Sequence, residues 1–163
     1  MTMKQQPILI ACALAALSLG AHSTASAQSP SPAAKEVSTK ITGAFDVKMT
    51  PQDDKLNDGV IRMLIDKQYH GDLEATSKGQ MLASGSAQTS GVYVAIETVT
   101  GTLKGQTGSF ALHHTGIMTQ GKPSLTISVV PGSGTGQLTG IAGQMIINIA
   151  DGKHFYEFTY TLP

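Results

Sequence analysis

From Thr39 to the C-terminus, apolar and polar residues alternate in short runs rich in Val, Ile, Thr, Phe and Tyr. Such alternation turns one face of each run toward a core, and these residue types favour strands over helices. Glycines and polar turns separate the runs. The pattern predicts eight strands, over Lys40–Thr50, Val60–Tyr69, Asp72–Ala87, Val92–Leu103, Gly108–Thr119, Leu125–Val130, Gly136–Ala150 and His154–Leu162.

The connections between these strands are short. Pro51–Gly59 is a polar loop, Gln120–Pro123 a tight turn, and Asp151-Gly152 a strong hairpin signal. Lys78-Gly79 is expected to bulge the third strand. Eight antiparallel neighbours can remove their exposed edges by closing on themselves. We therefore predict an all-β protein with an eight-stranded antiparallel closed β-barrel, filled or holding one small ligand. A two-sheet β-sandwich is the alternative.

Residue parity predicts which side chains face the core. In the last strand, one face carries His154, Tyr156, Phe158, Tyr160 and Leu162. In the fourth strand, Tyr93, Ala95, Glu97 and Val99 lie opposite Val94, Ile96 and Thr98. Because both faces of the fourth strand are apolar, we expect part of the outer wall to be covered by another subunit in a homo-oligomer.

The N-terminus has the pattern of a secretory signal peptide over residues 1–27. Lys4 precedes an apolar run over Pro7–Leu19, and Ala25-Ser26-Ala27 forms a cleavage site. The alternative is a lipobox, Leu9-Ile10-Ala11-Cys12, which would make a lipoprotein. Residues 28–38 read as a polar tether and 39–163 as the barrel domain. The expected location is the periplasm or the secreted fraction, with no membrane span, since the apolar run is too short for one.

Composition excludes several classes of function. The single cysteine, Cys12, leaves with the signal, which excludes a cysteine nucleophile, a cysteinate metal site and thiol redox chemistry. Removal of Lys4 leaves ten basic and eleven acidic residues, without a basic stripe, so nucleic acid is not an expected partner. The glycine-rich segment Pro131–Gly136 precedes a strand and lacks the lysine of a phosphate loop. We expect no cofactor.

Glu97 and His114 are the candidate catalytic residues. A carboxylate inside a barrel is costly unless it is paired or protonated. Facing inward, Glu97 would be a general base or a neutral acid with a raised pKa; facing outward, it would be an ordinary solvated side chain. His114 shares parity with Phe110 and is either a hydrogen-bonded core residue or the partner of Glu97. A turn centred near Gln106 would pair Glu97 with Thr115, close to His114.

A second polar cluster is His70-Gly71-Asp72-Leu73-Glu74. Fully extended, it would turn three polar groups to one side and could bind a metal or transfer protons. The favoured reading makes Gly71-Asp72 a turn, with His70 and Glu74 on separate strands. Since no pair of histidines or acidic loop has metal-ligand spacing, no metal site is predicted. His154 with Tyr156 is a weaker pairing, and the expected ligand-binding residues are Tyr93, Phe110, Glu74 and Tyr156.

Several stretches together resemble the bacterial family called domain of unknown function 3224 (DUF3224). They are His70–Gly79, Tyr93–Glu97, Gly108–Gly116, Val129–Gly140 and Asp151–Tyr156, within a match that extends over about Thr42 to Pro163. The resemblance implies the barrel of the allene oxide cyclase superfamily, which plant dirigent proteins share. Gly134–Gly143 is similar to the dirigent Gly-Thr-Gly-x-Phe-x-x-Ala-x-Gly run, with Leu138 in place of the aromatic residue. That motif is structural, so no active residue is carried over.

The sequence is compatible with three functions from different classes. The first is a binding barrel that holds a small apolar ligand. The second is a cyclase or isomerase that steers a reactive apolar intermediate, as the resemblance implies, with Glu97 and His114 as its acid and base. The third is an envelope or stress protein that acts through an oligomeric surface. Whether Glu97 lines a cavity would separate the second function from the others.

Overall fold

The computed structural model describes residues 37–53, 59–86 and 88–163. Its eight strands follow one another along the chain: β1 Thr39–Gln52, β2 Ile61–Gly71, β3 Leu73–Gly85, β4 Gly91–Leu103, β5 Gln106–Thr119, β6 Lys122–Val129, β7 Ala142–Ala150 and β8 Lys153–Thr161. A single turn of 3-10 helix, η1 (Gly136–Leu138), precedes β7. The predicted signal peptide and most of the predicted tether lie outside the described residues. Among the described residues, no helix has the length and apolarity needed to cross a membrane.

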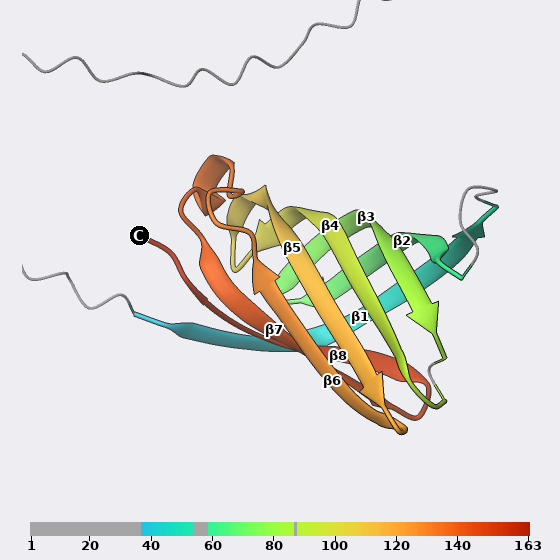
Figure 1. The fold of residues 1–163 in the computed structure, drawn as a ribbon. Coiled ribbons are helices and arrows are strands. Elements are labelled where there is room, and N and C mark those ends of the chain that lie inside the picture. Colours follow the sequence, from blue (N-terminus) through green and yellow to red (C-terminus); the bar gives the residue numbers. More distant parts are fainter. Residues whose placement is uncertain (1–36, 54–58, 87) are drawn as a thin grey trace, which may run out of the picture. The chain divides into compact units, whose positions relative to one another are not determined.

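The strands close into an antiparallel barrel, as the alternation predicted. Each strand pairs with the next, and β1 returns to pair with β8, with Gly43 opposite Tyr156 (Figure 1). The alternative of a two-sheet sandwich is therefore wrong. Because the barrel is closed, each described strand pairs with a neighbour on both sides. The pairing between β6 and β7 is short in the described residues: Ile127 pairs with Met145, and Ser128 pairs with Gln144.

Side chains alternate between the barrel interior and the outer wall. On β8, Tyr156, Phe158 and Tyr160 are buried, as their parity predicted. On β4, Ala95, Glu97 and Val99 point inward and are buried, whereas Val94 and Ile96 on the outer wall are 49% and 63% exposed. Both faces of β4 are thus apolar. The covering of this wall by a second subunit stays a prediction.

The two ends of the barrel differ, and we name them by that difference. The sealed end contains the β4–β5 turn and the loop Pro131–Ile141, and its buried side chains are Leu73, Leu103, Phe110, Leu138, Ile141 and Tyr156. The open end contains the β3–β4, β5–β6 and β7–β8 turns. Its inward-facing residues Met49, Ile61, Leu125 and Ile149 are exposed.

The glycine-rich loop is what closes the sealed end. The structure corrects the predicted seventh strand, because Gly136–Leu138 forms η1 and β7 begins at Ala142. The loop runs along β5, where the Thr135 amide donates to Ser109 O at 2.8 Å and the Thr107 amide to Gln137 Oε1 at 2.8 Å. These hydrogen bonds hold the loop against β5, and Leu138 is buried in the core. The alternation of apolar and polar residues cannot predict such contacts between distant segments.

Two other local predictions change, and a third is confirmed. The β3 ladder is continuous through Lys78 and Gly79, so the expected bulge is absent from this described strand. The β5–β6 turn consists of Gln120 and Gly121, because Lys122 already pairs with Thr119. Asp151 and Gly152 form the predicted hairpin, with positive φ angles of 50° and 72° that suit a two-residue turn.

Candidate functional site

Glu97 lies at the centre of the barrel and accepts hydrogen bonds from four side chains. Lys67 Nζ, His114 Nε2 and Tyr69 Oη lie 2.7, 3.0 and 3.1 Å from its Oε1, and Ser77 Oγ lies 2.5 Å from Oε2. Glu97 is fully buried, and all four donors are buried. The set forms a complete polar network inside an apolar barrel, as a buried charge requires.

Glu97 lies on β4, and its four donors come from three other strands; we call this whole set the Glu97 network. Lys67 and Tyr69 come from β2, Ser77 from β3, and His114 from β5, all at inward positions of their strands. Gly79 lies opposite Glu97, and a methyl group at Gly79 would collide with the backbone and Cβ of Glu97. Glycine at this position therefore lets β3 and β4 approach closely around the carboxylate.

The network holds Glu97 ionised. Burial alone would raise the pKa of this carboxyl, but the His114 hydrogen bond, the positive charge of Lys67 and the Ser77 hydroxyl outweigh burial and lower it to about 2. The expectation of a neutral acid with a raised pKa is thus not what the structure shows. Since an ionised carboxylate only accepts hydrogen bonds, Nε2 of His114 carries a proton.

Lys67 is also held by aromatic rings. Its Nζ lies 5.1 Å from the ring centroid of Phe45 and 5.6 Å from that of Tyr69, distances at which a ring face attracts a cation. It also lies 3.3 Å from Tyr69 Oη. Burial first, and then the charge of Glu97, raise the pKa of Tyr69 well above its ordinary value. Tyr69 is therefore a permanent hydrogen-bond donor to the carboxylate.

The structure brings Glu97 and His114 together, although by a different register from the one predicted. Glu97 pairs with Leu112, and His114 pairs with Ala95, so the two side chains are diagonal neighbours. The turn consists of Lys104 and Gly105, both with positive φ, so its centre lies earlier in the chain than the predicted centre near Gln106. That displacement moves the residue opposite Glu97 by three positions, from Thr115 to Leu112.

The other predicted site residues do not gather around Glu97. Phe110 and Tyr156 are buried at the sealed end, where Tyr156 Oη accepts from the Leu73 amide and donates to His70 O. Glu74 lies on the outer face of β3 and accepts from the Gly71 amide at 2.7 Å. Tyr93 points inward above Glu97, toward the open end.

The favoured reading of the second polar cluster agrees with the structure. β2 ends at Gly71 and β3 begins at Leu73, so His70 and Glu74 lie on separate strands. His70 Nε2 lies 3.2 Å from Asp46 Oδ2 on β1, on the exposed outer face. Within residues 37–53, 59–86 and 88–163, no three His, Cys, Asp or Glu side chains come together as metal ligands.

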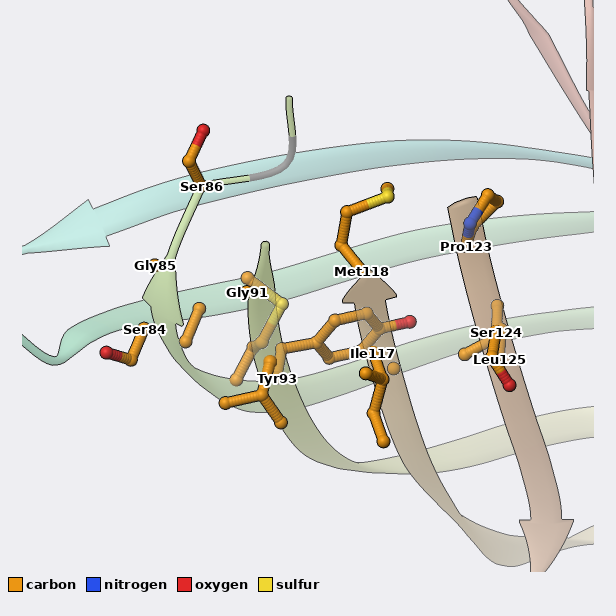
Figure 2. A pocket seen from close by; sticks show the side chains of 14 residues that line it. Ser84, Gly85, Ser86, Gly91, Tyr93, Ile117, Met118, Pro123, Ser124 and Leu125 are labelled. Carbon is orange, nitrogen blue, oxygen red and sulfur yellow. The ribbon is translucent and has the colours of Figure 1, made fainter. Parts of the chain in front are cut away.

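An apolar pocket of about 290 Å³ lies in the open end (Figure 2). Inward-facing residues from β3, β4 and β5 form its walls, and residues of β6 form one side of its rim. Its lining includes Met81, Ala83, Tyr93, Gly116, Met118, Pro123 and Leu125. None of the described residues that line it carries a charge. The pocket is thus a small apolar chamber whose one aromatic side chain is Tyr93.

Sequence reasoning missed Lys67, Tyr69 and Ser77 in the network and both methionines in the pocket. A signal for Lys67 was present, because Ile65, Lys67 and Tyr69 alternate with polar Asp66 and Gln68 along β2. Applied strictly, this alternation would have predicted that Lys67 faces the barrel interior. A lysine is usually read as solvated, since it is rarely buried without a partner.

Comparisons with known proteins give a family and a fold. The family model described as "Protein of unknown function (DUF3224)" matches residues 41–160. The chain is also similar to the crystal structure of a DUF3224 protein of unknown function from Shewanella oneidensis MR-1. That match has 50% sequence identity and a TM-score of 0.73, and covers 78% of this chain and 99% of the other. No curated protein matches the chain.

Proposed function

The chain belongs to the DUF3224 family, and we propose that it binds a small apolar molecule in the open end of its barrel. The observation that carries this proposal is the apolar pocket of about 290 Å³ beside Tyr93. Ligand sites are typically concave and mostly apolar, with a few polar groups that fix the ligand's orientation. The pocket has this composition.

The residues around the pocket support binding over simple packing. Met81 and Met118 line it, and methionine is a flexible, polarisable side chain that adapts to differently shaped partners. Leu125 lines the rim and is exposed although it occupies an inward position of β6. Apolar side chains left uncovered inside a barrel gain free energy when a ligand removes them from water.

A fluorescent apolar probe tests this proposal directly. N-phenyl-1-naphthylamine should bind saturably to the purified protein, with increased fluorescence. Ala83→Leu adds side-chain volume inside the pocket and should weaken binding by about tenfold, roughly the cost of overpacking. The matched control is Leu82→Ala, next along β3 but on the outer wall, which should bind the probe as the wild type does.

Two results would contradict the binding function. One is the absence of saturable probe binding to the folded wild-type protein. The other is equal weakening by Leu82→Ala and Ala83→Leu, which would place the probe on the outer wall. Circular dichroism of each variant confirms that the barrel is intact.

A cyclase or isomerase is the second candidate function. The observation that favours it is the 3.0 Å contact between His114 Nε2 and Glu97 Oε1 inside the barrel. In this candidate, the ion pair with Lys67 keeps Glu97 charged, and Glu97 orients the His114 imidazole. Neither Glu97 nor His114 is among the described residues that line the apolar pocket, which ranks this candidate below simple binding. The superfamily that the sequence resembles stays a prediction, and so does the catalytic role of both residues.

Bound molecules recovered from the native host would separate binding from isomerisation. Wild type and His114→Gln are purified from that host, and their small molecules are compared by chromatography and mass spectrometry. Isomerisation predicts equal mass and different retention, because the variant would hold unreacted substrate. Identical molecules in both proteins would remove the cyclase function and leave binding.

We also propose that the protein is exported, with cleavage after Ala27. The support is the sequence pattern of residues 1–27, with the Ala25-Ser26-Ala27 site. The intact mass of the protein from the periplasmic fraction should correspond to a chain that starts at Gln28. A mass that includes a lipid on Cys12 would favour the lipoprotein alternative.

A further inference from the structure

The pocket offers one well-placed polar group, the phenol of Tyr93. The ring lies across Gly116, where a methyl group would collide with it, so the glycine fixes the ring against the β5 wall. Figure 2 shows the Tyr93 hydroxyl pointing across β5 toward the side of the pocket formed by Leu125. Among the described residues, no side chain or backbone group forms a hydrogen bond with this hydroxyl. It is therefore available to a ligand.

The basic side chains nearest the barrel centre are already engaged. Lys67 Nζ and His114 Nε2 both donate to Oε1 of Glu97, at 2.7 and 3.0 Å. The residues that line the pocket carry no charge. Among the described residues, a negatively charged ligand group would therefore find no free cation in the pocket lining, and it would lose its hydration without compensation.

The phenol of Tyr93 keeps its proton. Burial first, and then the negative charge of Glu97, raise the pKa of Tyr93 above its ordinary value. The phenol therefore remains a hydrogen-bond donor.

Building on the proposed binding function, we propose that the pocket selects neutral ligands that have an apolar body and a carbonyl or hydroxyl oxygen. Tyr93 donates a hydrogen bond to that oxygen, while Met81 and Met118 contact the apolar body. Carboxylates and other anions are disfavoured, because none of the described residues that line the pocket is a cation.

Two probes of about equal size test the head-group preference. 2-Nonanone and octanoate have the same number of non-hydrogen atoms, so they differ in head group and not in size. They are titrated into the full chain at neutral pH by isothermal calorimetry. 2-Nonanone should bind at least about tenfold more tightly than octanoate, since burying an unpaired carboxylate is costly. Tyr93→Phe should weaken 2-nonanone binding by about fivefold, the effect of one neutral hydrogen bond, and leave the binding of N-phenyl-1-naphthylamine, which has no oxygen, unchanged.

A tyrosine outside the pocket gives the matched control. Tyr160→Phe removes the hydroxyl of a buried tyrosine on β8 that does not line the pocket, and it should leave the affinity for 2-nonanone unchanged. A purely structural role of Tyr93 would weaken 2-nonanone and N-phenyl-1-naphthylamine equally in Tyr93→Phe. The head-group difference is therefore the informative readout.

The inference is overturned if octanoate binds as tightly as 2-nonanone, or if Tyr93→Phe binds 2-nonanone as the wild type does. Either result, combined with saturable binding of N-phenyl-1-naphthylamine that Ala83→Leu weakens, leaves the proposed binding function intact. Failure of all three molecules to bind would overturn the inference and the proposed function together.

Discussion

The two ends of this barrel contain the same kinds of residues but place them in different surroundings. At the sealed end, Leu103, Phe110 and Leu138 are almost completely buried, and Phe110 stacks on Phe158 with ring centroids 5.6 Å apart. At the open end, Ile61 and Ile149 occupy inward positions yet are 53% and 67% exposed. An inward position on a strand is therefore not sufficient to bury a side chain.

Hydrogen bonding explains the difference between the ends. At the sealed end, the loop Pro131–Ile141 bonds to β5 and carries Leu138 and Ile141 into the core. Toward the open end, β6 and β7 have no paired positions beyond Ile127 and Ser128 among the described residues. The open end thus keeps exposed apolar surface, which a ligand can cover, while the sealed end supplies stability.

The Glu97 network separates the two ends, and breaking it should give the largest effect. Glu97→Ala leaves Lys67 buried without its counter-charge and should reduce the free energy of unfolding by about 3 to 5 kcal/mol. Urea unfolding measures this change. The control is Glu157→Ala, which breaks an exposed pair with Lys40 and should cost less than about 1 kcal/mol. Equal losses would contradict the network's role.

Truncation at each end should sharpen the comparison. Phe110→Ala creates a cavity at the sealed end and should lower the free energy of unfolding by about 3 to 4 kcal/mol. Met118→Ala at the open end removes a half-buried side chain and should lower it by about 1 kcal/mol. Thermal or urea unfolding compares the two variants. A larger loss for Met118→Ala would mean that the open end is packed.

Acid should weaken the barrel through Glu97. The pKa of this carboxyl is about 2 in the folded protein and about 4.5 when exposed, so its contribution to stability is present above about pH 4.5 and is lost as pH falls toward 2. The loss should be on the order of 3 kcal/mol. Urea midpoints measured across this range should fall for the wild type and change less for Glu97→Gln. Parallel profiles would show that Glu97 is not the group responsible.

The smallest effects are expected on the outer wall. Val94→Thr changes an exposed residue of β4 and should alter the free energy of unfolding by less than about 0.5 kcal/mol. The same replacement at Val99, buried on the inner face of this strand, should cost about 1 to 3 kcal/mol because it buries a hydroxyl. Urea unfolding of both variants tests the parity assignment. Equal costs would mean that the outer wall of β4 is also buried.

Local signals were sufficient to predict the barrel. Alternation on β4 and β8 identified the inward faces, and Asp151-Gly152 identified its hairpin. The loop before β7 was misread, because its fold depends on bonds to β5, more than twenty residues earlier in the chain. Contacts of that kind leave no periodic trace in the sequence.

The candidate site was only partly visible in the sequence. Parity and pairing brought Glu97 and His114 together, although the turn was misplaced. The third charged member, Lys67, escaped because lysine is normally assigned to solvent. The open end could not be predicted, since it depends on where β6 and β7 cease to pair.

Chemical-shift mapping tests the central claim, that the open end binds an apolar ligand. 2-Nonanone is titrated into ¹⁵N-labelled protein while backbone amide signals are followed. We expect saturable shifts concentrated at residues 81–86, 91–93, 116–118, 124 and 125, with Leu103 and Phe110 at the sealed end unchanged. Shifts confined to the outer wall, or no shifts at saturating ligand, would contradict the account.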